Sequence, residues 1–171
     1  MTVQRSPQFI ILICGVFLSN CEVIDLGAGT SYTEFRNIQN QESELVWVKG
    51  RMGGVIGLFE STNISSLVFE VVIGGYANSR SMLRVISRGG DKATTYDTQF
   101  LLNPNQYTPF WIKWTSSTVY LRPGTMDNNG PVLEWTRGDT VSVRYMAFRT
   151  GSTSAVKYMM NLSCSKTNIE I

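Results

Sequence analysis

The chain of 171 residues has room for one domain of ordinary size, and hydrophobic residues make up 43% of it, which is enough to form a core. Fifteen Lys and Arg stand against thirteen Asp and Glu, and the resulting charge of +2 argues against a nucleic-acid-binding protein with a broad basic surface. Because the chain has no histidine, Ser-His-Asp and Cys-His catalysis and histidine-based zinc sites are excluded.

The N-terminal segment, residues 1–21, has the pattern of a secretory signal peptide. Arg5 supplies a positive charge, residues 9–18 form an apolar run, and small residues precede a cleavage point at Cys21. The run is shorter than the roughly twenty apolar residues of a membrane span. The alternative is a buried core strand in the same run. We expect a secreted, extracellular protein without a membrane span, with a single domain over residues 22–171.

Two cysteines and two glycosylation motifs depend on this export. Cleavage a few residues before Cys21 would allow a disulfide with Cys164, whereas cleavage after Cys21 would leave Cys164 as the only thiol, and both alternatives stay open. Export would also expose the sequons at Asn63 and Asn161 to N-glycosylation.

Apolar residues recur with a period close to two along most of the chain, which is typical of β-strands. The alternation is clearest in three segments: 66–73, 110–114 and 141–148. Turns rich in Gly, Pro and Asn separate the apolar segments. We count about ten short strands and no amphipathic helix of three turns. The sequence therefore predicts an all-β fold, an antiparallel β-sandwich resembling a jelly roll.

Residues 23–30, Val-Ile-Asp-Leu-Gly-Ala-Gly-Thr, resemble the first motif of Rossmann-type S-adenosylmethionine methyltransferases. In those enzymes a strand ends in a glycine turn, a helix follows, and an acid about twenty positions later binds the ribose. Glu42 or Glu44 would fall near that position. However, residues 31–36 are expected to form another strand, and no crossover helices follow. We interpret the motif as a tight turn and expect no cofactor.

Three arginines, Arg80, Arg84 and Arg88, share one face of an expected strand, with no acid between Val71 and Gly90. Guanidinium groups suit carboxylate, sulfate or phosphate ligands. The alternative is an exposed sheet face on which the arginines pair with acids across neighbouring strands.

Trp111 lies between Phe110 and Ile112 and has the opposite strand parity, so its indole points away from the side of those two core candidates. An exposed indole can stack on a sugar ring. The alternative is packing in the core or between loops.

Several segments together resemble the farnesoic acid O-methyltransferase domain of arthropods and other invertebrates. The most specific is residues 69–84, with a strand, two glycines, an aromatic residue, Asn and a Ser-x-x-Arg pattern. Further segments follow the order of the family: 45–50, 55–58, 110–114, 132–135 and 143–148. Residues 115–118 and 121–122 depart from the family pattern, outside the central block. The resemblance covers about residues 31–160.

The family name implies transfer of a methyl group from S-adenosylmethionine to farnesoic acid. The missing Rossmann pattern and the expected export from the cytosol argue against this reaction. By resemblance, family members occur beside lectin-like modules in secreted proteins, which implies recognition of glycans. The leading hypothesis is a non-enzymatic module that binds a carbohydrate or another extracellular partner. The alternatives are the methyltransferase itself and a structural or defensive secreted protein.

The turn in the central block is the first candidate for a site. Gly74 and Gly75 can place the backbone at positive φ and so shape the turn around the residues that follow. The predicted ligand-binding residues are Gly75, Tyr76, Asn78, Arg80, Arg84 and Trp111. The alternative is a purely structural turn. No catalytic or metal-binding residue is assigned, and the ligand and the oligomeric state stay open.

Overall fold

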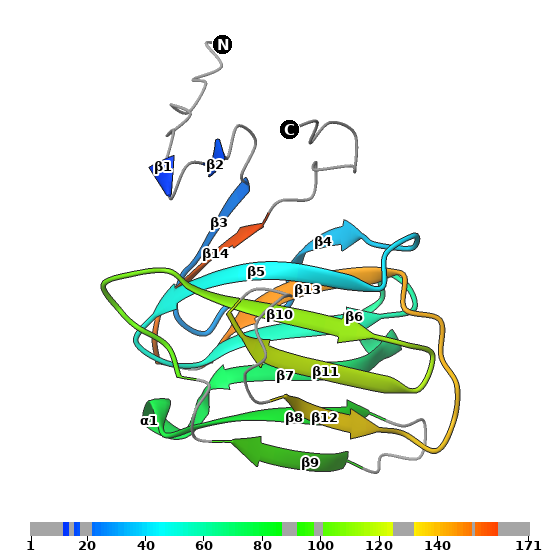
Figure 1. Cartoon of the computed structure of the whole chain (residues 1–171). Helices are drawn as coiled ribbons and strands as arrows, with labels where there is room; N and C mark the ends of the chain where they lie inside the picture. Colours follow the sequence, from blue (N-terminus) through cyan, green and yellow to red (C-terminus); the bar gives the residue numbers. More distant parts are fainter. Residues whose placement is uncertain are drawn as a thin grey trace.

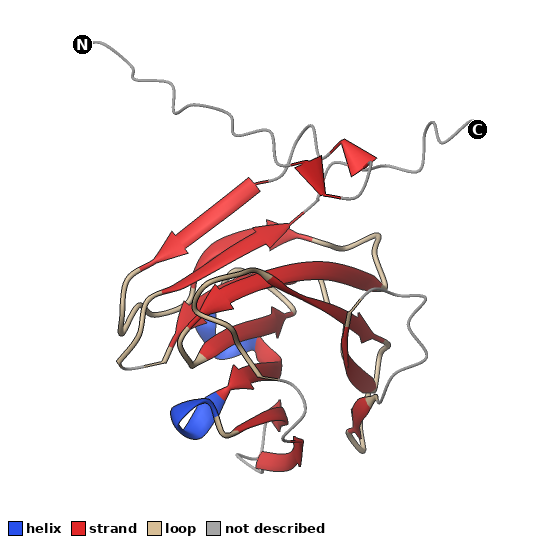
Figure 2. Cartoon of the chain, turned by 60° about the vertical axis from the view of Figure 1, so that its left-hand side comes forward, coloured by secondary structure: helices blue, strands red, loops and turns tan. Residues whose placement is uncertain are grey.

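The chain folds into two antiparallel six-stranded sheets that pack face to face (Figure 1). The computed structural model describes residues 12–13, 16–17, 22–86, 92–97, 101–124, 132–151 and 153–160. Figure 2 shows how little helix accompanies the strands. The all-β sandwich predicted from the alternation of apolar residues is therefore confirmed.

The first sheet has the strand order β12-β11-β10-β5-β14-β3. Its strands are β3 (Glu22–Leu26), β5 (Ser43–Gly50), β10 (Thr108–Trp114), β11 (Thr118–Pro123), β12 (Leu133–Thr136) and β14 (Val156–Met160). The second sheet has the order β4-β13-β6-β7-β8-β9. Its strands are β4 (Thr33–Asn37), β6 (Gly54–Phe59), β7 (Leu67–Gly74), β8 (Arg80–Ile86), β9 (Lys92–Asp97) and β13 (Tyr145–Thr150).

Four short elements lie outside these sheets. They are the paired strands β1 (Leu12–Ile13) and β2 (Val16–Phe17), the 3-10 helix η1 (Ile64–Ser66) and the four-residue turn α1 (Gly75–Asn78). No helix in the described part of the chain is long and apolar enough to cross a membrane. Most of residues 1–21 lie outside the described residues, and the signal peptide stays a prediction.

The two sheets contain twelve strands, whereas the sequence predicts about ten. The difference arises because the shortest strands carry too little alternation to be recognised. Strand β12, for example, has four residues, of which one is buried.

The core lies between the sheets and is filled by the faces that the alternation predicts. Phe69, Val71 and Ile73 of β7 have no exposed side-chain surface, and β10 turns its buried residues toward them across the interior. Strand β7 is also buried on its other face, from Val68 to Gly74. Side chains therefore cover part of the outer surface of the second sheet as well.

The glycine motif after β3 forms a turn that carries the chain into β4 of the other sheet. The Thr30 hydroxyl donates to the Gly27 carbonyl over 2.6 Å, and the Thr150 hydroxyl donates to the same carbonyl over 2.8 Å. A strand follows this turn rather than a helix. The interpretation of the motif as a tight turn is confirmed.

Four loops meet at the end of the sandwich where α1 lies (Figure 1). Backbone hydrogen bonds join them in series: Gly29 donates to Gly151, Gly151 to Gly53, and Gly53 to Gly74, over 3.1, 2.7 and 2.8 Å. A Cβ atom at Gly53 would lie 3.2 Å from the Gly151 Cα atom, on backbone with φ of 74°, so a larger residue would be strained at this position. We call this series the glycine seam.

Candidate functional site

The turn α1 is built from residues with left-handed backbone. Gly74 has φ of 64°, and Tyr76, Ala77 and Asn78 have φ of 50°, 59° and 61°. The expectation of positive φ is confirmed at Gly74, whereas at Gly75 it is wrong, and the three residues that follow carry it instead. Each non-glycine residue in this conformation costs roughly 1–2 kcal/mol. Such strain persists only where the surroundings hold it in place.

Side chains on both sides of the turn hold it. The Asn78 amide donates to the Leu102 carbonyl and accepts from the Leu102 amide, each over 2.9 Å. The Gly74 amide donates to the hydroxyl of the buried Ser81 over 2.8 Å. Asn78, a predicted ligand-binding residue, is therefore engaged in bracing the turn.

The turn presents Tyr76 to the surface, where the residue is 57% exposed. The Arg80 guanidinium carbon lies 4.6 Å from the centre of the Tyr76 ring, a cation–π contact between two predicted site residues. The braced backbone and this contact together fix the position of the exposed ring.

Tyr76 stands at the rim of a cavity of about 350 Å³ on the outer face of the second sheet. Val55, Val72 and Met82 pair in register across β6, β7 and β8 and give it an apolar floor. The remaining wall includes Gly75, Ala77, Thr153 and Ser154, together with Arg84 and Arg149. We call it the α1 pocket. Its volume falls in the range that is usual for small-molecule sites.

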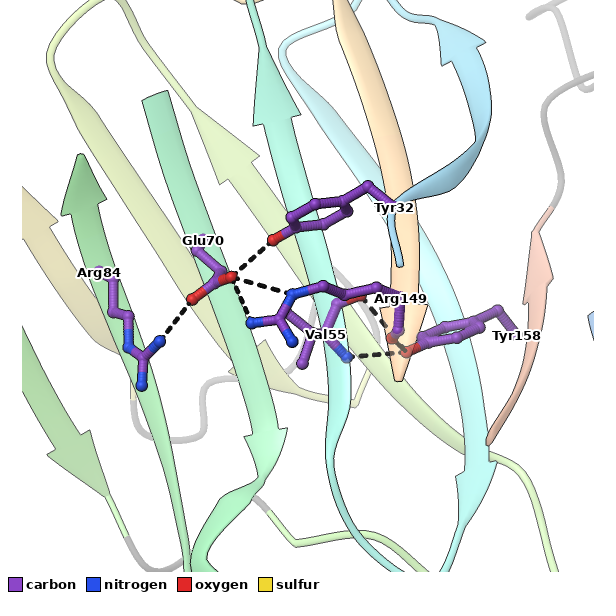
Figure 3. A network of polar contacts seen from close by, with 6 residues as sticks. All are labelled: Tyr32, Val55, Glu70, Arg84, Arg149 and Tyr158. Atoms are coloured by element: carbon purple, nitrogen blue, oxygen red, sulfur yellow. Dashed lines mark hydrogen bonds and ion pairs between the residues drawn. The ribbon is translucent and has the colours of Figure 1, made fainter. Parts of the chain in front are cut away.

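A charged cluster lies beside the pocket, around the buried Glu70 (Figure 3). Tyr32 donates to Glu70 Oε1 over 2.7 Å, and Arg149 donates to the same oxygen from Nη2 and Nε over 2.6 and 3.2 Å. Arg84 donates from Nη1 to Glu70 Oε2 over 2.8 Å. The pairing of arginines with acids across strands, one of the two alternatives for this face, is confirmed for Arg84.

The cluster keeps its charges near neutral pH. Burial raises the pKa of the Glu70 carboxyl, but hydrogen bonds from Tyr32 and Arg149 and the charges of Arg149 and Arg84 outweigh it, so the pKa lies below its usual value. Burial, reinforced by the Glu70 charge, raises the pKa of the Tyr32 phenol. One carboxylate therefore faces two guanidinium groups, and the cluster has an excess of one positive charge.

Two features position the cluster. The Tyr158 side chain extends from β14 through the core to the second sheet. There its hydroxyl accepts from the Val55 amide and donates to the Arg149 carbonyl, each over 2.7 Å. These bonds tie β6 to β13 at the pair that carries Arg149 (Figure 3). The Tyr32 ring lies over Gly57, where a Cβ atom would approach the ring to 2.7 Å. A larger residue at Gly57 would displace the phenol that holds Glu70.

A second hollow of about 510 Å³ adjoins the cluster on the side of β4. Tyr32, Glu70 and Arg149 line it, together with Gly29, Thr30, Ser31, Ile64 and Thr150. Arg149 also lines the α1 pocket, so one guanidinium borders both hollows. Ile64, 55% exposed, directly follows the sequon residue Asn63.

Trp111 does not join the other predicted site residues. It lies on β10 of the first sheet, and the Arg122 guanidinium carbon is 5.3 Å from the centre of its indole. The indole is partly buried, and its Nε1 has no hydrogen-bond partner in the described part of the chain. Trp111 is therefore separated from the α1 pocket by the thickness of the sandwich.

The remaining predictions are the two glycosylation sites, the disulfide and the third arginine of the expected strand. Asn63 is exposed, and its side-chain oxygen accepts from the Ser65 amide over 2.8 Å at the start of η1. Cys21, Cys164, Asn161 and Arg88 lie outside the described residues. Within the described ranges, no group of three or more acidic or cysteine side chains is placed to hold a metal ion.

Sequence reasoning missed Tyr32, Glu70 and Arg149 as members of one site. Glu70 carries a signal, because it is the single charged residue in the apolar strand Leu67–Gly74, and a buried carboxylate needs partners. Its partners carry no such signal, since Tyr32 and Arg149 lie 38 and 79 residues away along the chain.

Comparison with known proteins gives a family and a fold. The family model described as farnesoic acid O-methyl transferase matches residues 29–163. Chicken galectin 2 is similar in structure, with a TM-score of 0.52 and 10% identity over 75% of this chain and 99% of that one. A variant of human galectin-16 has a TM-score of 0.50 and 8% identity over 79% of this chain and 93% of its own. Comparison with curated proteins finds no significant match.

Proposed function

The chain belongs to the farnesoic acid O-methyltransferase family, and we propose that it is a secreted, non-enzymatic recognition module that binds carbohydrate at the α1 pocket. The observation that carries the proposal is Tyr76, an exposed ring held at the rim of the pocket by a strained and braced turn. Strained backbone at such a rim is a pointer to function. The sandwich fold shared with galectins fits this role.

The pocket has the chemistry that a sugar ring requires. One face of a sugar ring is apolar and packs on an aromatic ring, whereas its hydroxyl groups need hydrogen-bond partners. Tyr76 offers the aromatic face, and Val55 and Val72 offer an apolar floor. Arg84 and the hydroxyl groups of Thr153 and Ser154 supply polar partners along the wall.

A glycan array with the purified protein tests the proposal. Tyr76→Ala removes the exposed ring, and we expect the affinity for the bound glycan to fall about tenfold or more. Tyr120→Ala is the matched control, because Tyr120 is a partly buried tyrosine on β11 of the other sheet. The absence of glycan binding, or equal binding by both variants and the wild type, would contradict the proposal.

Methyl transfer to farnesoic acid is the second candidate, and the family membership favours it. A Rossmann-type cofactor loop requires a helix after the glycine motif. Residues 22–37 form a strand, a turn and a strand, which gives this candidate no such loop. Incubation with labelled S-adenosylmethionine and farnesoic acid, with Gly27→Val as control, tests it. A Cβ atom at Gly27 meets no atom closer than 3.9 Å, and a melting curve of the variant checks that the fold is kept. Donor binding that this variant abolishes would support the enzyme.

Secretion is part of the proposal and has its own test. We expect expression in a secretory host to remove the segment 1–21 and to attach a glycan at the exposed Asn63. The intact mass before and after deglycosylation and reduction reports the cleavage site, the glycans and any bond between Cys21 and Cys164. Retention of the full-length, unmodified chain inside the cell would exclude export.

A further inference from the structure

The charged residues that line the α1 pocket are both arginines, Arg84 and Arg149. Among the residues that the structure describes, no acidic residue belongs to the lining. Glu70, the acid that pairs with both arginines, is 4% exposed and lies outside the lining. A ligand in the pocket therefore meets two guanidinium groups, and none of the described lining residues is a carboxylate.

The two guanidinium groups have more donors than Glu70 can accept. Each guanidinium carries five N–H groups. Arg84 reaches Glu70 through Nη1, and Arg149 reaches it through Nε and Nη2. The Arg84 and Arg149 side chains are 31% and 27% exposed, whereas that of Glu70 is 5% exposed. The buried Glu70 therefore binds both arginines, and part of each guanidinium side chain stays accessible at the surface.

The geometry also favours an anion over a neutral group. The cluster holds one positive charge in excess, in a partly buried place where charges are screened less than in water. Arginine forks bind carboxylate and sulfate oxygens with charge-assisted hydrogen bonds, which are about twice as strong as neutral ones. A neutral saccharide would leave the excess charge without a counter-charge.

We propose that the saccharide bound at the α1 pocket is acidic, and that its carboxylate or sulfate group lies against Arg84 and Arg149 while a sugar ring packs on Tyr76. This inference rests on the proposed function. Glu70 acts as a positioning residue, because it orients both guanidinium groups and does not contact the ligand.

Titration calorimetry with three size-matched oligosaccharides tests the inference: a neutral glucan, a hyaluronan fragment that carries only carboxylates, and a chondroitin sulfate fragment. We expect an acidic fragment to bind the wild type about tenfold or more tightly than the neutral glucan, and the difference to shrink in high salt. The second and third arms distinguish a carboxylate from a sulfate ligand. Arg84→Gln is expected to remove the preference, and Arg84→Lys to retain part of it.

Arg144→Gln is the matched control, because Arg144 is exposed, lies outside both hollows and changes the net charge equally. Equal or tighter binding of the neutral glucan by the wild type would overturn the inference and leave the proposed function standing. A preference that survives in Arg84→Gln, or that Arg144→Gln abolishes, would also overturn it. Binding of none of the three saccharides would overturn the inference, and the glycan array would decide the proposed function separately.

Discussion

The side-chain amide of Asn78 and the backbone of Leu102 exchange two hydrogen bonds across 24 residues of the chain. Asn78→Ala leaves the Leu102 amide and carbonyl without these partners, and we expect the free energy of unfolding to fall by about 2–3 kcal/mol. Urea denaturation measures the change. Asn103→Ala is the control, because the Asn103 side chain accepts one exposed bond from Asn105. Equal losses in both variants would contradict the bracing role.

Ala77 occupies left-handed backbone with φ of 59° and is exposed. Ala77→Gly removes the steric penalty but makes the unfolded chain more flexible, and we expect a net stabilisation of about 0.5–1 kcal/mol. For a chain of this size the melting temperature would rise by about 2 °C. Ala155→Gly, at an exposed residue without positive φ, should lower the melting temperature. A lower melting temperature for Ala77→Gly would mean that the turn is unstrained.

Tyr158 connects the two sheets through its buried hydroxyl. Tyr158→Phe keeps the ring but leaves the Val55 amide and the Arg149 carbonyl unpaired by this hydroxyl, so we expect a loss of about 1–3 kcal/mol in the free energy of unfolding. Tyr120→Phe, at a partly buried tyrosine, should change it by less than about 0.5 kcal/mol. Chemical denaturation of both variants makes the comparison, and similar values would argue against the inter-sheet role.

Because of Glu70, the free energy of unfolding is expected to fall as the solution becomes acidic. Its pKa in the folded chain lies below that in the unfolded chain, so its contribution is complete above the ordinary glutamate value of about 4.3 and is lost as pH falls through the lower folded value. We expect Glu70→Gln to lose about 3 kcal/mol at pH 7 and to show a weaker acid dependence than the wild type. Unfolding curves between pH 7 and strong acid measure both, with the exposed Glu134→Gln as control. An unchanged acid dependence in Glu70→Gln would refute the assignment.

Glu44 has the opposite dependence. Glu44 lies opposite Ile112 in the first sheet, on the buried face of β5. Burial raises the pKa of its carboxyl to about 7, although a backbone hydrogen bond at Leu45 opposes the shift. Because the folded pKa is raised, the contribution is complete below about 4.3 and is lost as pH rises through about 7. We expect Glu44→Gln to be about 2 kcal/mol more stable than the wild type at pH 8 and similar at pH 4. Equal stability at both pH values would place the ionised carboxylate in water.

The sandwich could be predicted because alternation is a local property. Phe69, Val71 and Ile73 lie two positions apart, and the period alone assigns them to one face. The tight turn after β3 was accessible for the same reason, since the strand that follows the glycines shows its own alternation.

The site was only partly accessible from the sequence. Tyr76 and Arg84 lie in one short block, and the turn brings them to one pocket. Arg149 reaches the same pocket because β13 enters the second sheet between β4 and β6, an order that no local pattern encodes. Trp111 was separated from them by the same topology, because β10 belongs to the other sheet.

The glycine seam limits how this architecture can diversify. Because Gly29, Gly151, Gly53 and Gly74 are linked in series, an insertion in one loop would break bonds with its neighbours and disturb the rim of the pocket. We expect relatives with different ligands to vary in single side chains such as Tyr76, while changes of loop length collect at the far end of the sandwich. Recognition would then evolve by substitution on a fixed frame rather than by remodelling of loops.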